Sequence, residues 1–279
     1  MKRDVKKFYI FKVNGKDTKR IEDTVVREFP LTILLNNHEI MTLICTPSNL
    51  DYLAAGFLFS EGLIKKKSQI KNIIIDLENS SARVETWEDN QMEGGIAPKR
   101  FITSSGGKIT SLLSDINVQK KREIESQIEI SADEIFSLMD KFVLSSQIFK
   151  NTGGVHSAAL CDKRNLLLFS EDIGRHNAID KVFGECILKG VQTDELIIIT
   201  SGRVSSEILL KVAKRNVPLI ISKSAPTDMG IQLSQELGIT LVGFVRGRRM
   251  NVYTHGWRVI KGEPFPEEDN PPIEHLPGD

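Results

Sequence analysis

ELIIITSGRVSSEILLKVAKRNVPLIIS, residues 195–222, is the stretch from which the fold of this chain can be predicted. Two short apolar runs, 196–200 and 218–222, flank a segment whose apolar residues recur every three or four positions. The order strand, helix, strand is typical of a βαβ unit, whose two strands lie parallel in one sheet. Neither run alternates apolar with polar residues, so we expect helices to cover both faces of the sheet.

The same alternation continues on both sides of this unit. Its other predicted elements are strands over 155–161, 166–170 and 240–245, and helices over 131–149, 174–190 and 227–238. Ser131 and Glu134 are spaced as a capping box at the start of the first of these helices. The sequence therefore predicts an α/β domain with a mainly parallel sheet.

The first third of the chain has a different pattern, rich in predicted strands. Residues 22–47 read as a hairpin turned at Asn36 and Asn37, two residues that tolerate a left-handed turn. A helix follows over 48–64, and a second hairpin turns near 78–81. We predict three parts: a β-rich unit with one helix over 1–115, the α/β domain over 116–265, and a mobile, acidic, proline-rich tail over 266–279.

Composition excludes several classes of protein. The 279 residues contain 37 Lys+Arg and 37 Asp+Glu, so the net charge of zero gives no general attraction to nucleic acid or to a membrane surface. No secretory signal or membrane-spanning run is expected, and we place the protein in the cytoplasm. Cys45, Cys161 and Cys186 are far apart and predicted to be buried thiols. No histidine or cysteine pair has metal-ligand spacing, so no metal site is predicted.

Polar residues gather in the four loops that follow the predicted strands of the α/β domain. Because ligands bind outside the carboxyl ends of such strands, these loops are the candidate binding site. They contribute Arg175, His176, Asn177, Ser201, Gly202, Arg203, Lys223, Arg246, Arg248 and Arg249. Arginine side chains and helix N-termini both favour phosphate, which predicts a phosphate-bearing ligand; the alternative is a set of ordinary solvated loops. No P-loop or dinucleotide-binding glycine motif is present.

Two histidines are candidates for acid–base chemistry or ligand binding. His156 lies in TGGVHSAAL, and His176 lies between Arg175 and Asn177 in a loop that opens a helix. Either could act as a general base, donate a hydrogen bond to a ligand, or serve structure alone.

The loop RFITSSGGKITSLL, residues 100–113, is rich in small polar residues and glycine. Gly106 and Gly107 permit close backbone approach, and Lys108 adds a positive charge. Such a loop could cradle an anion, carry a nucleophile, or form a turn.

Five segments together resemble the FdhD family, over about residues 22–260. They are DYLAAGFLFSEGLI, TGGVHSAAL, EDIGRHNAIDKV, TSGRVSSEI and SAPTDMGIQLSQELGITLVGFVRGRRMNVYTH. The resemblance implies a formate dehydrogenase accessory protein that passes sulfur from a cysteine desulfurase to the molybdenum cofactor, bis-molybdopterin guanine dinucleotide. It implies a three-layer α/β/α, cytidine-deaminase-like larger domain, and we also expect a homodimer. The family's cofactor-binding stretch falls on Phe244, Val245, Arg246, Gly247, Arg248 and Arg249, with a guanine nucleotide as a mimic of the ligand.

One feature of that family has no counterpart here. The family's persulfide-bearing cysteine would fall at Ser105 or Gly106, and no cysteine lies between Cys45 and Cys161. We therefore expect a protein that binds the cofactor without relaying sulfur through this loop. The alternatives are a relay through Cys161 or Cys186, a lost or replaced carrier function, and a nucleotide- or pterin-processing hydrolase.

Overall fold

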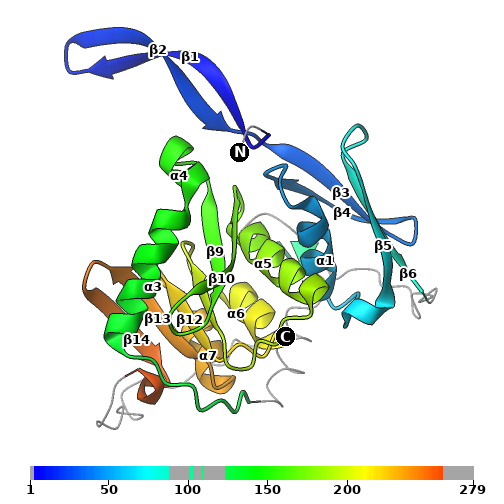
Figure 1. The fold of residues 1–279 in the computed structure, drawn as a ribbon, viewed down its shortest axis with the longest axis vertical. Helices are drawn as coiled ribbons and strands as arrows, with labels where there is room; N and C mark the ends of the chain where they lie inside the picture. Colours follow the sequence, from blue (N-terminus) through cyan, green and yellow to red (C-terminus); the bar gives the residue numbers. More distant parts are fainter. Residues whose placement is uncertain (1–2, 88–100, 103–107, 110–122, 260–279) are drawn as a thin grey trace.

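The computed structural model describes residues 3–87, 101–102, 108–109 and 123–259. It has a mixed α/β fold in which a six-stranded and a four-stranded sheet lie next to each other with their helices (Figure 1). The tail predicted over 266–279 and the boundary predicted near residue 115 fall outside the described residues. The division into units 1–115 and 116–265 therefore stays a prediction.

The larger sheet has the strand order β10-β9-β11-β12-β13-β14. Its strands are β9 (His156–Cys161), β10 (Leu166–Asp172), β11 (Ile197–Thr200), β12 (Leu219–Ser222), β13 (Thr240–Arg246) and β14 (Arg249–Thr254). The central strands β11, β12 and β13 are parallel, as the βαβ pattern predicted. The sheet as a whole is mixed, because β9 and β14 run antiparallel to their neighbours. The expectation of a mainly parallel sheet is thus corrected.

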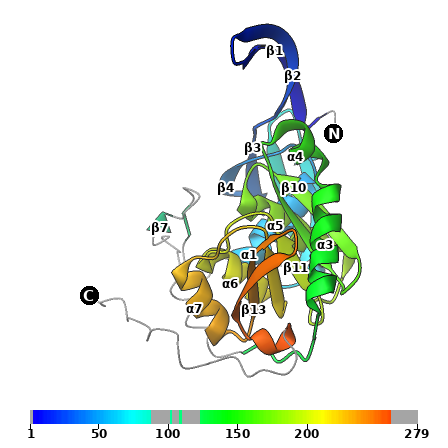
Figure 2. The ribbon, with the colours of Figure 1, turned by 90° about the vertical axis from the view of Figure 1, so that its left-hand side faces the viewer.

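Helices cover both faces of this sheet and create three layers. Helices α5 (Arg175–Lys189), α6 (Ser206–Lys214) and α7 (Asp228–Glu236) pack with Leu160, Ile198 and Ile220 on one face. Helix α3 (Ala132–Ser145) packs with Ala159 and Ile199 on the other, as Figure 2 shows. Successive strand residues thus enter opposite cores, which explains why the strands are continuously apolar. The capping box of Ser131 and Glu134 is present at the start of α3.

The smaller sheet has the order β4-β3-β6-β5 and carries helix α1. Its elements are β3 (Phe29–Leu35), β4 (His38–Cys45), α1 (Leu50–Ser60), β5 (Ile70–Asp76) and β6 (Ser81–Thr86). Asn36 and Asn37 have φ values of 47° and 67°, which confirms the predicted left-handed turn. The described chain also contains several short elements: α4 (Gln147–Thr152), β7 (Phe101–Ile102), β8 (Lys108–Ile109), and the 3₁₀ turns Lys67–Gln69 and Gly256–Arg258.

Helices α1 and α5 join the two sheets by packing backbone against backbone. A Cβ atom at Gly56 would lie 1.8 Å from the carbonyl oxygen of Asp180, and one at Gly184 would lie 1.8 Å from that of Tyr52. Only hydrogen fits at either position. The two glycines therefore set the distance between the helices.

Buried ion pairs flank this junction. Lys181 Nζ lies 2.7 Å from Asp172 Oδ2, and both side chains are fully buried. The same carboxylate accepts a hydrogen bond from the backbone N–H of Thr46 at 3.0 Å. A second pair joins Lys211 to Asp180, which also accepts a hydrogen bond from the Ser60 hydroxyl. Each charge is compensated, as burial requires.

A long hairpin, which the sequence pattern did not predict, precedes both sheets. Strands β1 (Val5–Asn14) and β2 (Asp17–Val26) pair only with each other among the described residues. The hairpin projects beyond α4 in both ribbon views (Figures 1 and 2). At its base, Val26 touches Gly154, where a Cβ atom would lie 2.7 Å from Val26 Cγ1. We call this hairpin the arm.

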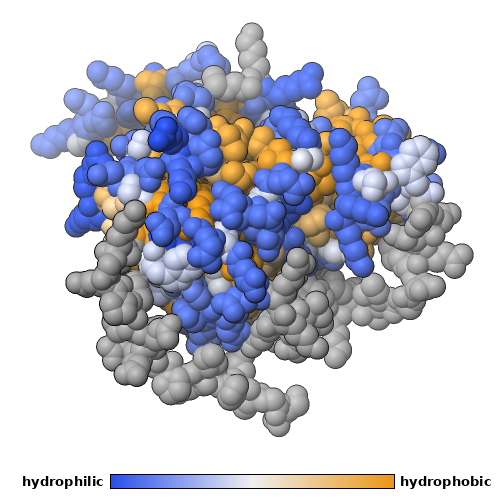
Figure 3. Space-filling view, turned by 60° about the horizontal axis from the view of Figure 1, so that its bottom comes forward, coloured by the Kyte–Doolittle hydropathy of each residue, from blue (hydrophilic) through white to orange (hydrophobic). Residues whose placement is uncertain are grey.

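The molecular surface opposite the arm carries mainly hydrophilic side chains, with smaller hydrophobic areas between them (Figure 3). None of the described helices is long and apolar enough to cross a bilayer.

Candidate functional site

The loops that were predicted to gather do meet at one edge of the larger sheet. Strand β9 is antiparallel to both β10 and β11, so β10 runs in the same direction as β11, β12 and β13. The carboxyl ends of those four strands therefore share an edge, and the start of β9, with His156, lies there too.

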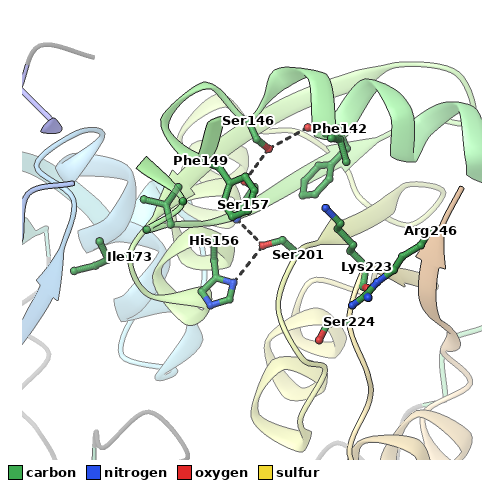
Figure 4. Close-up of a pocket in the computed structure, with 14 residues that line it drawn as sticks. Phe142, Ser146, Phe149, His156, Ser157, Ile173, Ser201, Lys223, Ser224 and Arg246 are labelled. Atoms are coloured by element: carbon green, nitrogen blue, oxygen red, sulfur yellow. Dashed lines mark hydrogen bonds between the residues drawn. The ribbon is translucent and has the colours of Figure 1, made fainter. Parts of the chain in front are cut away.

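A pocket of about 450 Å³ opens at this edge (Figure 4). One wall is apolar and comes from the end of α3, from α4 and from the loop before α5. The other wall is polar and comes from the loops after β11 and β12 and from the end of β13. The lining residues are Phe142, Val143, Ser146, Phe149, Gly153, Gly154, Val155, His156, Ser157, Ile173, Ser201, Lys223, Ser224 and Arg246.

Hydrogen bonds connect the two positively charged residues of the pocket, Lys223 and Arg246, to each other and to the end of β11. The N–H of Lys223 donates to Thr200 O at 3.1 Å, and its carbonyl accepts a hydrogen bond from Arg246 Nε at 3.2 Å. Lys223 Nζ lies 5.9 Å from the centroid of the Phe149 ring. The described lining contains two cationic side chains and no carboxylate. This combination favours an anion that also has a flat apolar part.

Hydrogen bonds fix the serine and histidine side chains of the pocket. Ser201 Oγ accepts a hydrogen bond from the Ser157 N–H at 2.9 Å and lies 3.2 Å from His156 Nδ1. Ser157 and Ser146 pair through their hydroxyls at 3.0 Å. Burial and the nearby positive charges of Arg175 and Arg203 lower the pKa of His156, which favours the neutral form of its ring.

The pocket wall is tied to the junction between the two sheets through Glu171. Its two carboxylate oxygens accept hydrogen bonds from the N–H groups of Ile148 and Phe149, both at 2.9 Å. Those groups begin helix α4 and have no partner within the helix. The backbone carbonyl of Glu171 accepts a hydrogen bond from the Thr46 hydroxyl. One residue therefore holds the aromatic wall and contacts the smaller sheet.

Three predicted site residues lie beside the pocket in hydrogen-bonded or closely packed positions. Asn177 is buried and donates hydrogen bonds to Ile44 O and Asp172 Oδ1, each at 2.9 Å. His176 Nε2 lies 3.3 Å from Glu207 Oε2, and burial together with the charges of Lys211 and Arg175 lowers its pKa to about 2. A histidine held neutral by burial is a poor proton acceptor. Gly202 is packed tightly against the Arg175 side chain, where a Cβ atom would lie 2.8 Å from Arg175 Cβ.

The six-residue stretch 244–249 is not a uniform binding surface. Arg246 lines the pocket, whereas Val245 is fully buried in the core with α3. Phe244 is 40% exposed with a φ of 53°, and Gly247 turns the β13–β14 hairpin with a φ of 58°. The guanidinium of Arg248 lies over the Phe136 ring of α3, and Arg249 is exposed at the start of β14. The loop after the predicted strand 240–245 is therefore short, because β14 begins at Arg249.

Sequence reasoning missed the apolar wall. Phe142, Phe149 and Ile173 look like ordinary helix or loop residues in the sequence. The periodicity of apolar residues indicates that a side chain is buried, but it does not distinguish a side chain in the core from one that lines a pocket. The glycine pair Gly153-Gly154 just before His156 was the available signal of a place where the backbone approaches a ligand.

The remaining predicted residues divide into those that the structure places and those that it does not. Arg203 is exposed near His156, and its charge acts on that ring. Ser105 and Gly106 lie outside the described residues. Cys45, Cys161 and Cys186 are free and fully buried, which confirms that expectation. Burial raises the pKa of all three thiols, that of Cys45 to about 12.

Fold and pocket together define an α/β protein with a basic, partly aromatic pocket at one edge of its larger sheet. The FdhD/NarQ family matches residues 26–260. The sulfur carrier protein FdhD of Bacillus subtilis is 43% identical over 250 residues, covering 90% of this chain and 95% of that protein. The sulfur carrier protein FdhD of Bacillus pumilus is 44% identical over 239 residues, covering 86% and 91%.

A solved structure from Desulfotalea psychrophila, described as a formate dehydrogenase accessory protein, is similar to this fold with a TM-score of 0.75. The two chains are 26% identical, and the match covers 92% of this chain and 99% of that one. The chain belongs to the FdhD/NarQ family.

Proposed function

We propose that this protein is an accessory factor for formate dehydrogenase that holds a guanine-dinucleotide molybdenum cofactor in the pocket. The observation that carries the proposal is the pairing of Lys223 and Arg246 with the aromatic side chain of Phe149, in a described lining without carboxylates. A nucleotide offers both partners, an anionic phosphate and a flat base. The cofactor is then cargo, which the protein receives and passes on.

The size of the pocket limits how much of that cargo it takes. A volume of about 450 Å³ lies within the range of sites for single small ligands, so it suits one nucleotide end of the cofactor. The remainder would extend along the sheet edge, toward Arg175 and Arg203. The three layers of the larger domain support the cytidine-deaminase-like fold that the family resemblance implies. We place this function in the cytoplasm, in a homodimer.

We further propose binding without a sulfur relay through the 100–113 loop. A persulfide needs a reactive thiolate, and a serine or glycine at positions 105 and 106 offers none. The buried thiols have raised pKa values, which disfavours attack on a persulfide of a cysteine desulfurase. In this mechanism the protein shields the cofactor until its target enzyme accepts it.

Isothermal titration calorimetry tests the ligand class. GDP is expected to bind more tightly than ADP, because a guanine-dinucleotide site should discriminate the base while both nucleotides offer the same phosphates. Equal affinity for the two nucleotides, or no binding of either, would contradict the proposal.

A hydrolase is the second candidate, because Ser201 Oγ and His156 Nδ1 are 3.2 Å apart. That geometry resembles a nucleophile and its base. The lowered pKa of His156 makes its ring a weaker base, which favours binding over turnover. Incubation with GDP, followed by chromatography for GMP and phosphate, separates the two candidates, since binding alone leaves GDP intact.

A further inference from the structure

The arm is an unusual element because nothing in the described structure covers it along most of its length. Tyr9 and Phe11 are 70% and 72% exposed, and the outer edges of both strands pair with no other strand of the described residues. A lone two-stranded ribbon is marginally stable in water, and free strand edges pair readily with other strands. The matched family region begins at residue 26, where the arm ends. These features are typical of a segment that binds another polypeptide strand.

The charged residues of β2 are arranged so that two antiparallel copies of this strand would place opposite charges face to face. Residues 19–23 read Lys, Arg, Ile, Glu, Asp, with two cations before Ile21 and two anions after it. The four charged residues are exposed, and Ile21 is half-buried opposite Ile10 of β1. If two such strands pair antiparallel about Ile21, Lys19 faces Asp23 and Arg20 faces Glu22, twice each. Opposite charges at directly facing positions stabilise strand pairs.

We propose that a second copy of this chain binds through β2, pairing the two β2 strands antiparallel about Ile21. The result is a four-stranded sheet in the order β1-β2-β2-β1, with four ion pairs at its centre. On one face, Ile10 and Ile21 of each copy make a continuous apolar row. This inference rests on the homodimer proposed above and names its interface, a surface that the pocket does not use.

The other edge of the arm does not support self-association. Strand β1 carries Lys6, Lys7 and Lys12 and no acidic residue. Two paired β1 strands have no acidic residue that could face these lysines in any register, so they gain none of the opposite-charge pairs that stabilise facing strands. Within each arm the Lys7–Glu22 ion pair and the stacking of Arg20 on Tyr9 hold the central side chains in place. The β2 edge is thus the one suited to a second copy.

Charge reversal provides a direct test by sedimentation and light scattering. The double variant Lys19→Glu/Arg20→Glu leaves only anions beside Ile21, and Glu22→Lys/Asp23→Lys leaves only cations. Each variant alone is expected to raise the dimer dissociation constant by at least about tenfold. Mixing the two variants restores the facing opposite charges, so a heterodimer is expected with an affinity near that of the wild type.

The matched control is Lys6→Glu/Lys16→Glu, which changes the charge of the arm as much as Lys19→Glu/Arg20→Glu does, at positions that face none of residues 19–23 within the hairpin. It is expected to dimerise as the wild type does. A monomeric wild type, unchanged dimerisation of both reversal variants, or no rescue on mixing would each overturn the proposal. GDP binding by every variant is measured alongside, because its retention separates loss of pairing from loss of the fold or of the proposed function.

Discussion

Arg246 and Arg248 stand on either side of Gly247, but their side chains lie against different surfaces. Arg246 lines the pocket and donates a hydrogen bond to Lys223 O at 3.2 Å. Arg248 lies over the Phe136 ring, 3.6 Å from the exposed carboxylate of Asp133. The turn at Gly247 reverses the chain and sends the two guanidinium groups apart. Position in a motif therefore does not establish a role in binding.

Because only one of the two arginines lines the pocket, replacing each of them by alanine gives a test variant and its matched control. Arg246→Ala is expected to weaken GDP binding by about 1.5–3 kcal/mol, the range for a hydrogen bond to a charged group. Arg248→Ala is expected to change it by less than about 0.5 kcal/mol, as an exposed residue outside the pocket should. Calorimetry on the two variants checks this, and equal losses in both would assign the whole stretch to the ligand.

The sequence predicted part of the site at the level of single residues. Ser201, Lys223 and Arg246 were predicted because polar residues after strands of an α/β sheet meet at one edge, and His156 was predicted as a candidate for acid–base chemistry or ligand binding. All four line the pocket. Asn177 could not be told from them, since its hydrogen bond to Ile44 O joins segments far apart in the chain. Burial of that kind depends on how the smaller sheet docks, which periodicity does not encode.

At the scale of elements, prediction succeeded where an element has one buried face. The helix 174–190 and the β3–β4 hairpin have such faces, and both are present. The arm was missed because its residues are mostly exposed on both faces, so its strands lack the usual buried face. The N-cap of helix α1 is Asn49, which has a left-handed φ of 52° and lies one residue after the start of the predicted helix 48–64.

The contact between α1 and α5 is the element-level feature most sensitive to substitution. Gly56→Ala or Gly184→Ala places a methyl group where a backbone carbonyl oxygen already lies, so the helices must separate. Each is expected to lower the free energy of unfolding by about 2–3 kcal/mol or more, despite the better helix propensity of alanine. Denaturant titration followed by circular dichroism measures the change.

Asp140→Ala, on the exposed side of α3, is the control for those two glycines. It is expected to alter stability by less than about 0.5 kcal/mol. If a glycine variant proved as stable as this control, the close helix contact would be wrong.

At the scale of the whole molecule, the thiols are distributed so that all three lie inside packed cores. Cys45 belongs to the smaller sheet's core, Cys161 to the core between the larger sheet and α3, and Cys186, on α5 itself, to the core on the other face of that sheet. Desolvation is the largest cause of the raised pKa in each case. A thiol of this kind is a weak nucleophile near neutral pH.

Incubation with a cysteine desulfurase and labelled cysteine is therefore expected to leave the 100–113 loop without sulfur and to label the buried cysteines slowly at most. Mass mapping of the peptides provides the readout. Ser105→Cys and Gly106→Cys serve as gain-of-function variants, one of which is expected to acquire a persulfide. Rapid stoichiometric labelling of Cys161 or Cys186 in the wild type would instead support a relay through a relocated cysteine.

The junction between the two sheets also has a consequence for synthesis. Thr46 meets Asp172 across 126 residues of chain, and Ser60 meets Lys214 across 154. A ribosome adds about 5–20 residues per second, so the first unit waits roughly 6–25 s for the helix that covers it. During that interval the side of α1 that contains Gly56, which packs against α5 in the folded protein, is exposed to solvent outside the ribosome. The nascent chain, more than the finished protein, is the form in which that surface is open to chaperones and to wrong partners.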